Sequence, residues 1–191
     1  HTFRAAHGIP WELLPQEMGC ASGMTCWRCL RDWQEAGVWK RVHQVLLDRL
    51  WGSDQIDRSR ASLDSASVAA PGGRKEGAEP NGSRKIGVER HLVVDRQGIP
   101  LAVTHSAANG HDCKMLEETV DATEPIRRPR GRPRKRPSKL DADKGYDFRF
   151  CRQALRDRGI TPRIARRGIE SSKKLGRHRW VVERTLSWLN R

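Results

Sequence analysis

The feature that most limits the fold of this chain is a change of hydrophobic period. Apolar side chains alternate with polar ones over residues 86–94 and again over residues 99–103, and the polar residues 95–98 separate the two runs. Alternation with period two is typical of a half-buried strand, and a short Gly-containing turn between two such runs predicts a β-hairpin. We therefore expect antiparallel strands, rather than helices, in the middle of the chain.

Strand and helix patterns then alternate toward the C-terminus. A polar strand is also expected before the hairpin, and Asp112 is expected to cap the helix that follows it. Strands arranged first in a hairpin and then alternating with helices predict a mixed α/β fold with helices covering a sheet. The expected strands are residues 60–68, 139–143 and 160–165, and the expected helices are residues 112–120, 148–158 and 178–191.

The N-terminal region has a different pattern. Residues 1–52 are helical in period and hold five of the seven tryptophans, and Gly37 separates two helical stretches. A helix-turn-helix unit and a small helical bundle with a tryptophan core both explain this pattern. The chain is thus expected to have two parts, a helical region at 1–52 and a mixed α/β domain at 53–191 with a basic loop at 125–138.

Charge is concentrated in the last third of the chain. The formal net charge is +14, and residues 125–191 hold 22 basic and 6 acidic side chains. A surface this positive attracts polyanions, and nucleic acid is the first candidate because each phosphate contact releases a counterion. No apolar run approaches the roughly 18 residues of a bilayer span, so no membrane role is expected.

An odd number of cysteines favours a reducing cytoplasm over a disulfide framework, with a zinc site on Cys20, Cys26, Cys29 and His43 as a weaker alternative.

Three carboxylates occupy positions that suit metal-assisted phosphoryl transfer. Asp64 lies inside a strand of small uncharged residues, where aspartate is disfavoured. Asp143 ends a strand, and Glu183 lies at the margin of the apolar face of the last helix. Such chemistry needs about three carboxylates that meet in space to hold two divalent ions.

Each of these residues also has a structural explanation. Asp64 could be an edge-strand charge, Asp143 could cap the following turn, and Glu183 could pair with Arg179 four residues earlier. The hypothesis of a metal site therefore depends on the three residues occurring together, in this order and context.

Two C-terminal segments carry a family resemblance. Residues 141–147, DADKGYD, and residues 176–185, GRHRWVVERT, resemble the second and third catalytic blocks of bacterial insertion-sequence transposases of the DDE class, in the group named for insertion sequences four and five. Asp64 lies where that family keeps its first aspartate. Residues 10–15 and 33–39 are similar to the family's helical DNA-binding region.

The resemblance implies a ribonuclease H-like fold, with Asp64 on its first strand, Asp143 after its fourth and Glu183 on a following helix. These three would hold two Mg²⁺ ions, with Mn²⁺ as a substitute, for strand cleavage at transposon ends and strand transfer into target DNA. It further implies double-stranded DNA as partner and a homodimer on DNA. Residues beside the carboxylates that would contact phosphates are Lys144, Arg179 and Arg184.

The basic loop at 125–138 adds a second set of candidate DNA contacts. Part of it, PRGRPR, resembles the core of an AT-hook that enters the minor groove, although a solvated loop tracking phosphates explains it as well. The chain has no initiating methionine and stops inside a helical pattern, so we expect a truncated copy in a bacterial cytoplasm, associated with the nucleoid. A non-catalytic DNA-binding remnant is the alternative function. The loop residues expected to bind DNA are Arg130, Arg132, Arg134, Lys135 and Arg136.

Overall fold

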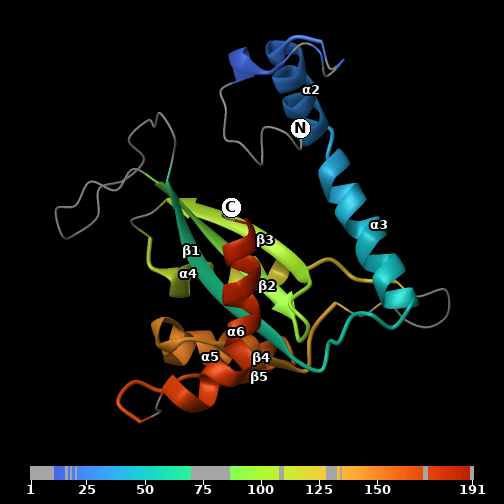
Figure 1. The fold of residues 1–191 in the computed structure, drawn as a ribbon. Coiled ribbons are helices and arrows are strands. Elements are labelled where there is room, and N and C mark those ends of the chain that lie inside the picture. The colour runs from blue at the N-terminus through green and yellow to red at the C-terminus, as the bar shows by residue number, and fades with distance from the viewer. Residues whose placement is uncertain are drawn as a thin grey trace. The chain divides into compact units, whose positions relative to one another are not determined.

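A computed structural model provides the fold of the chain (Figure 1). Contacts divide the chain into a compact unit within His1–Leu46 and a second over Leu47–Asn190, and each is described by itself. The structure describes residues 11–189, apart from residues 16, 18, 20, 70–86, 108–109, 128–132, 134 and 170–171.

The first unit is helical, as the sequence predicts. It contains η1 (Trp11–Leu13), α2 (Gly23–Glu35) and the start of α3 (Val38–Gly52), which continues into the second unit. Ser22 caps α2, because its hydroxyl accepts a hydrogen bond from the Thr25 backbone N–H at 3.2 Å. Gly37 separates the two helices with a φ of +65°, a left-handed conformation that glycine adopts without strain.

Tryptophans of this unit do not form a buried core among the described residues. Trp27, Trp33 and Trp39 each keep 40–42 % of their surface exposed. Trp33 and Trp39 pack edge to face with their ring centroids 5.7 Å apart. The described part of the unit thus lacks the buried tryptophan core that one of the two alternatives, the small helical bundle, predicts.

The second unit is a mixed α/β domain, which confirms the predicted fold class. Its five strands form one sheet in the order β3-β2-β1-β4-β5, in which β1 pairs antiparallel with β2 and parallel with β4. The strands are β1 (Ala61–Ala69), β2 (Gly87–Asp95), β3 (Pro100–Ala107), β4 (Lys139–Ala142) and β5 (Thr161–Ile164). The helices are α4 (Asp112–Asp121), η3 (Lys144–Tyr146), α5 (Arg149–Asp157) and α6 (Ser172–Leu189).

Side-chain alternation in β2 explains how helices cover both faces of this sheet (Figure 1). Val93 belongs to the larger core cluster, to which α4 and α5 contribute. Its neighbours Leu92 and Val94 point to the other face and pack against α6. The helix α6 therefore lies on the opposite face of the sheet from α4.

The predicted hairpin is β2–β3, and Asp95 fixes its turn. The Asp95 carboxylate is fully buried and accepts hydrogen bonds from the backbone N–H groups of Asp57, Gln97 and Ile99 at 2.8–2.9 Å. Gly98 adopts a φ of +96° in this turn, a conformation that suits glycine. The backbone carbonyls of Gln97 and Gly98 in this turn accept hydrogen bonds from Arg184 and Thr185 of α6.

Three local expectations need correction. The strand β1 lies at the centre of the sheet, so the interpretation of Asp64 as an edge-strand charge is wrong. The helix α4 has His111 at its N-cap, and Asp112 is its first residue. The last helix begins at Ser172, six residues before the expected start at residue 178.

Candidate active site at the edge of β1 and β4

Parallel pairing of β1 and β4 brings the first two predicted carboxylates level with each other. The last ladder pair is Ser62 with Asp141, and continuing this register by two residues on each chain brings Asp64 and Asp143 together, in agreement with the effect of the Asp143 charge on Asp64. Residues two apart share a face, and the Ser62 hydroxyl donates to the His178 backbone carbonyl of α6 at 3.2 Å. Asp64 and Asp143 therefore lie on the face of the sheet that α6 covers.

Arg179 links the first and third predicted carboxylates. Its Nη2 donates to Asp64 Oδ2 at 3.2 Å and lies 3.6 Å from Glu183 Oε1, one helical turn further along α6. The side chains of Arg179 and Asp64 are 19 % and 16 % exposed, whereas that of Glu183 is 58 % exposed. The predicted pairing of Glu183 with Arg179 is present, and it joins Glu183 to Asp64 through the same nitrogen.

Asp143 has the capping contact predicted for it. The backbone of Asp143 is extended at the N-cap of η3, and its Oδ1 accepts a hydrogen bond from the Gly145 N–H at 2.7 Å. A Cβ at Gly145 would lie 2.8 Å from that oxygen, so glycine permits the tight turn. The side chain of Lys144 is exposed beside this turn.

Burial sets the protonation behaviour of Asp64. Desolvation raises the pKa of the Asp64 carboxyl above its usual range, and the negative charge of Asp143 raises it further. The Arg179 guanidinium and the Ser65 backbone N–H oppose this shift because they stabilise the ionised form. Asp64 is therefore a partly buried carboxylate that depends on a nearby cation.

Asp141 and Asp143, two residues apart in one motif, have different surroundings. Asp141 is fully buried, and both of its carboxylate oxygens accept from Arg60 Nη1, at 2.9 and 3.0 Å. Asp143 is partly exposed at the end of β4. The ion pair of Asp141 thus helps to hold β4 beside β1. Asp143 stays accessible just past the C-terminal end of β4.

The opposite face at this edge carries polar residues that the sequence analysis missed. The Ser65 hydroxyl lies 2.9 Å from Asp112 Oδ2 and 3.1 Å from Glu89 Oε1. Tyr146 is buried nearby, and desolvation together with the charges of Asp112, Asp64 and Asp143 raises the pKa of its hydroxyl. The sequence signal available for these residues was a polar side chain shortly after each predicted aspartate, Ser65 after Asp64 and Tyr146 after Asp143.

Arg184, predicted to contact phosphates, has intramolecular partners on α6. Its guanidinium lies 4.6 Å from the Trp180 ring and 4.7 Å from the Trp188 ring, and its Nη2 donates to the Gln97 carbonyl at 2.6 Å. Trp180 and Trp188 are 49 % and 57 % exposed. In this structure Arg184 joins α6 to the β2–β3 turn.

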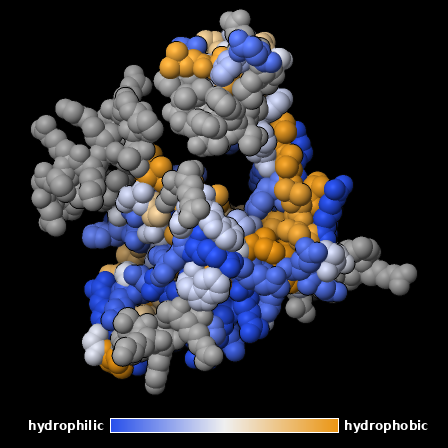
Figure 2. Space-filling view, viewed as in Figure 1, coloured by the Kyte–Doolittle hydropathy of each residue, from blue (hydrophilic) through white to orange (hydrophobic). Residues whose placement is uncertain are grey.

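The basic loop is only partly described. Arg130, Arg132 and Arg134 lie outside the described residues, so their predicted DNA contacts stay predictions. Arg136 Nη1 donates to the Arg158 carbonyl at 2.8 Å, and the Lys135 carbonyl accepts from Arg58. Figure 2 shows hydrophilic side chains over much of the visible surface of the second unit.

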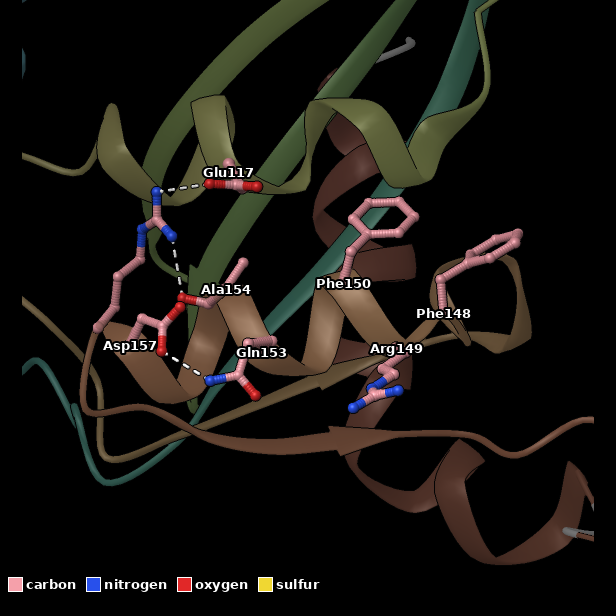
Figure 3. A pocket seen from close by; sticks show the side chains of 8 residues that line it. Glu117, Phe148, Arg149, Phe150, Gln153, Ala154 and Asp157 are labelled. Carbon is pink, nitrogen blue, oxygen red and sulfur yellow. Dashed lines mark hydrogen bonds and ion pairs between the residues drawn. The ribbon is translucent and has the colours of Figure 1, made fainter.

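An open hollow of about 660 Å³ lies beside α5 and does not include the three predicted carboxylates (Figure 3). Its Glu117 accepts a hydrogen bond from Arg158 at 3.0 Å, and its Asp157 accepts one from Gln153 at 2.8 Å. Phe150 is 48 % exposed there. The acids of this hollow are thus bonded to neighbouring side chains, and the candidate site stays at the edge of β1 and β4.

The chemical type of the three predicted carboxylates suits a hard divalent cation, although their spacing in this structure does not form a closed metal site. Carboxylate oxygens are the donors that Mg²⁺ prefers, and the Arg179 guanidinium already stands as a cation between Asp64 and Glu183. Across the described residues, no three His, Cys, Asp or Glu side chains are gathered closely enough to hold a metal ion. For the zinc alternative, Cys26 and Cys29 form no disulfide and Cys20 is outside the described part.

The mixed five-stranded sheet and a matching family model define the class of protein. Asp64 lies on β1, Asp143 directly after β4 and Glu183 on α6, in the order that the sequence resemblance implies. The family model described as the transposase DDE domain matches residues 56–191, and the chain belongs to this family. A second model, described as a putative transposase of the IS4/5 family, matches residues 2–43.

Two curated relatives are described as transposases, and a third is a protein of the same element as the first. A putative transposase for insertion sequence element IS402 of Burkholderia cepacia is 43 % identical over 141 residues, 73 % of this chain and 65 % of the relative. An uncharacterised 16.2 kDa protein of the same element is 60 % identical over 74 residues, 38 % of this chain and 50 % of the relative. The transposase for IS1106 of Neisseria meningitidis serogroup B is 27 % identical over 121 residues, 58 % of this chain and 38 % of the relative. The chain thus spans less than two thirds of the length of each.

The described helices are too short or too polar for a bilayer. In the part of the chain that the structure describes, none of them combines the length and apolar character needed to cross a membrane.

Proposed function

We propose that this chain cleaves DNA strands at the ends of a mobile element and joins them to target DNA, with divalent metal ions held by Asp64, Asp143 and Glu183. The observation that carries the proposal is the shared contact of Arg179 with Asp64 and Glu183, with Asp143 two residues past the ladder pair of Ser62 and Asp141. Two Mg²⁺ ions bound there would activate the attacking oxygen and stabilise the leaving oxygen of a phosphodiester.

The residues of the chain have separate parts in this proposal. Asp143 keeps one oxygen on the Gly145 N–H, which orients the carboxylate at the sheet edge and leaves its other oxygen for a cation. Lys144 is exposed next to it and would contact a phosphate beside the scissile bond. Asp141 stays paired with Arg60 inside the sheet and takes no part in the reaction.

DNA binding would extend beyond the carboxylates. The helical region at 1–52 would recognise the element ends, and the basic residues from Arg130 to Arg136 would follow the phosphate backbone. Two element ends must be brought together before strand transfer, so the active form would be a homodimer on DNA. The domain at 53–191 would carry the chemistry.

The test uses purified chain, linear DNA carrying the element's terminal repeats, and Mg²⁺. We expect nicking at the repeat ends by the wild type and its loss in Asp143→Asn, with DNA binding kept in both. Asp157→Asn is the matched control, because Asp157 is an exposed acid on α5 away from the sheet edge. It should nick like the wild type.

Other outcomes separate the rival functions. Salt-dependent DNA binding with no nicking by wild type or Asp143→Asn would refute the catalytic proposal for this chain and support a DNA-binding remnant. Nicking without preference for the terminal repeats over a shuffled sequence would indicate a general nuclease of the same fold.

A further inference from the structure

We propose that Arg179 is a built-in cation that holds Asp64 and Glu183 together before metal binds and leaves them when metal and DNA arrive. This inference rests on the proposed function, because it concerns the same carboxylates. It assigns to Arg179 a positioning and exchange role, in addition to the phosphate contact that the sequence predicts.

The geometry gives one nitrogen to two carboxylates. Nη2 of Arg179 is 3.2 Å from Asp64 Oδ2 and 3.6 Å from Glu183 Oε1, so a single positive group is shared between a strand and a helix. A divalent ion bound by the same two side chains would use these oxygens as well. Arg179 and a metal ion therefore compete for the same ligands.

Electrostatics explain why a cation is needed at this edge at all. Asp64 is only 16 % exposed, and Asp143 follows Asp141, the residue paired with Ser62, by the same two residues by which Asp64 follows Ser62. A buried carboxylate beside a second one is unfavourable unless a positive charge compensates. Arg179, itself 19 % exposed, supplies that charge from within the chain.

Arg179 is held in a way that permits exchange. Among the described residues, its side-chain hydrogen bond and ion pairs go to Asp64 and Glu183 alone, and its Nε is buried without a partner. Arg184, one turn further along α6, is instead fixed by the Gln97 carbonyl and two tryptophan rings. Arg179 can therefore leave these two carboxylates without breaking a hydrogen bond or ion pair to any other residue that the structure describes.

A DNA phosphate is the natural second partner for the released guanidinium. Arginine binds phosphate and carboxylate with the same fork of N–H donors. Once a phosphate takes Arg179, the carboxylates are left for metal, so DNA and metal should each tighten the binding of the other. Such coupling is reciprocal, since it is a property of the two binding equilibria.

The experiment measures Mn²⁺ affinity by electron paramagnetic resonance of free Mn²⁺, without activity as a readout. Wild type, Arg179→Gln, Arg179→Lys and Arg156→Gln are titrated with and without a short DNA duplex. Arg156 is an exposed arginine of α5, so Arg156→Gln loses the same charge away from the site. Asp64→Asn reports whether the bound Mn²⁺ uses the proposed carboxylates.

Without DNA, we expect Arg179→Gln to bind Mn²⁺ about fivefold or more tightly than the wild type, as for a typical coupling between sites. Arg179→Lys and Arg156→Gln should stay near the wild-type affinity. Duplex DNA should tighten Mn²⁺ binding to the wild type and to Arg156→Gln, and should have little effect on Arg179→Gln.

Equal or weaker Mn²⁺ binding by Arg179→Gln would overturn the inference, and so would DNA tightening of the same size in that variant and the wild type. If Asp64→Asn abolishes Mn²⁺ binding in that case, the proposed metal site stands and only the role of Arg179 is wrong. If neither wild type nor Arg179→Gln binds Mn²⁺, the proposed metal site fails together with the inference.

Discussion

Replacing Leu186 with alanine tests how α6 is held on the sheet. Leu186 is 4 % exposed and packs in a small cluster with Leu92, Val94, Val181 and Val182. The substitution removes three carbon groups at about 0.8 kcal/mol each, and the cavity it leaves raises the expected loss in unfolding free energy to about 3–4 kcal/mol. With a urea slope of about 2 kcal/mol per molar, the unfolding midpoint should fall by about 1.5–2 M.

The measurement is equilibrium urea unfolding followed by far-UV circular dichroism. Leu189→Ala is the control on the same helix, because Leu189 is 44 % exposed and should cost no more than about 0.5 kcal/mol. Similar midpoints for Leu186→Ala and Leu189→Ala would refute the argument that this cluster fixes α6. An altered slope in Leu186→Ala alone would indicate that α6 detaches separately from the rest of the domain.

Two further predictions concern ion pairs. Arg60→Ala leaves the fully buried Asp141 carboxylate without its cation, and we expect a loss of about 3 kcal/mol in unfolding free energy by urea titration at pH 7; a loss below about 1 kcal/mol would contradict this. The hydrogen bond from Arg152 and the positive charge of Arg152 lower the pKa of the Asp147 carboxyl. The ion pair therefore stabilises the fold above about pH 4–5, and this stabilisation is lost as the pH falls through the pKa of Asp147 in the folded state. The stability difference between wild type and Asp147→Asn, measured by urea unfolding from pH 7 to pH 3, should therefore shrink below about pH 4, and a constant difference would count against it.

Hydrophobic period was sufficient to predict the strands because it reports burial directly. The alternation in residues 86–94 and 99–103 corresponds to β2 and β3, whose side chains divide between the two core clusters. The start of α6 was missed because residues 172–177 contain no apolar stripe like that of Val181, Val182 and Leu186.

Contacts between residues far apart in the chain could not be predicted from the sequence. An isolated aspartate in a polar strand looks the same at an edge and at the centre of a sheet, so the position of β1 between β2 and β4 had to come from the fold. Arg179 was predicted as a partner of Glu183 because the two are four residues apart, but its bond to Asp64 spans 115 residues. Local spacing predicts contacts within one helix and carries no information on such a bond.

Asp141 and Asp143 show the same limit within one motif. Strand alternation assigns residues two apart to the same face, so the period of the segment does not by itself separate their surroundings. The difference comes from Arg60, 81 residues away, which neutralises Asp141 inside the sheet. Asp143 lies one position past the end of the strand, where the chain turns into η3 and the carboxylate reaches the edge.

The two kinds of element in the candidate site differ in how firmly they are fixed. Asp64 and Asp143 lie on or next to strands joined by backbone hydrogen bonds, whereas Arg179 and Glu183 share one helix that packs on Leu92 and Val94 of β2 and bonds to the β2–β3 turn. Thr185 donates to the Gly98 carbonyl at 2.8 Å and so sets the rotation of α6 close to Glu183. Any shift of α6 moves Arg179 and Glu183 together, which keeps their mutual contact and changes only their distance to the strands. Exchange of Arg179 for a metal ion therefore requires side-chain movement on α6 and no change in the sheet.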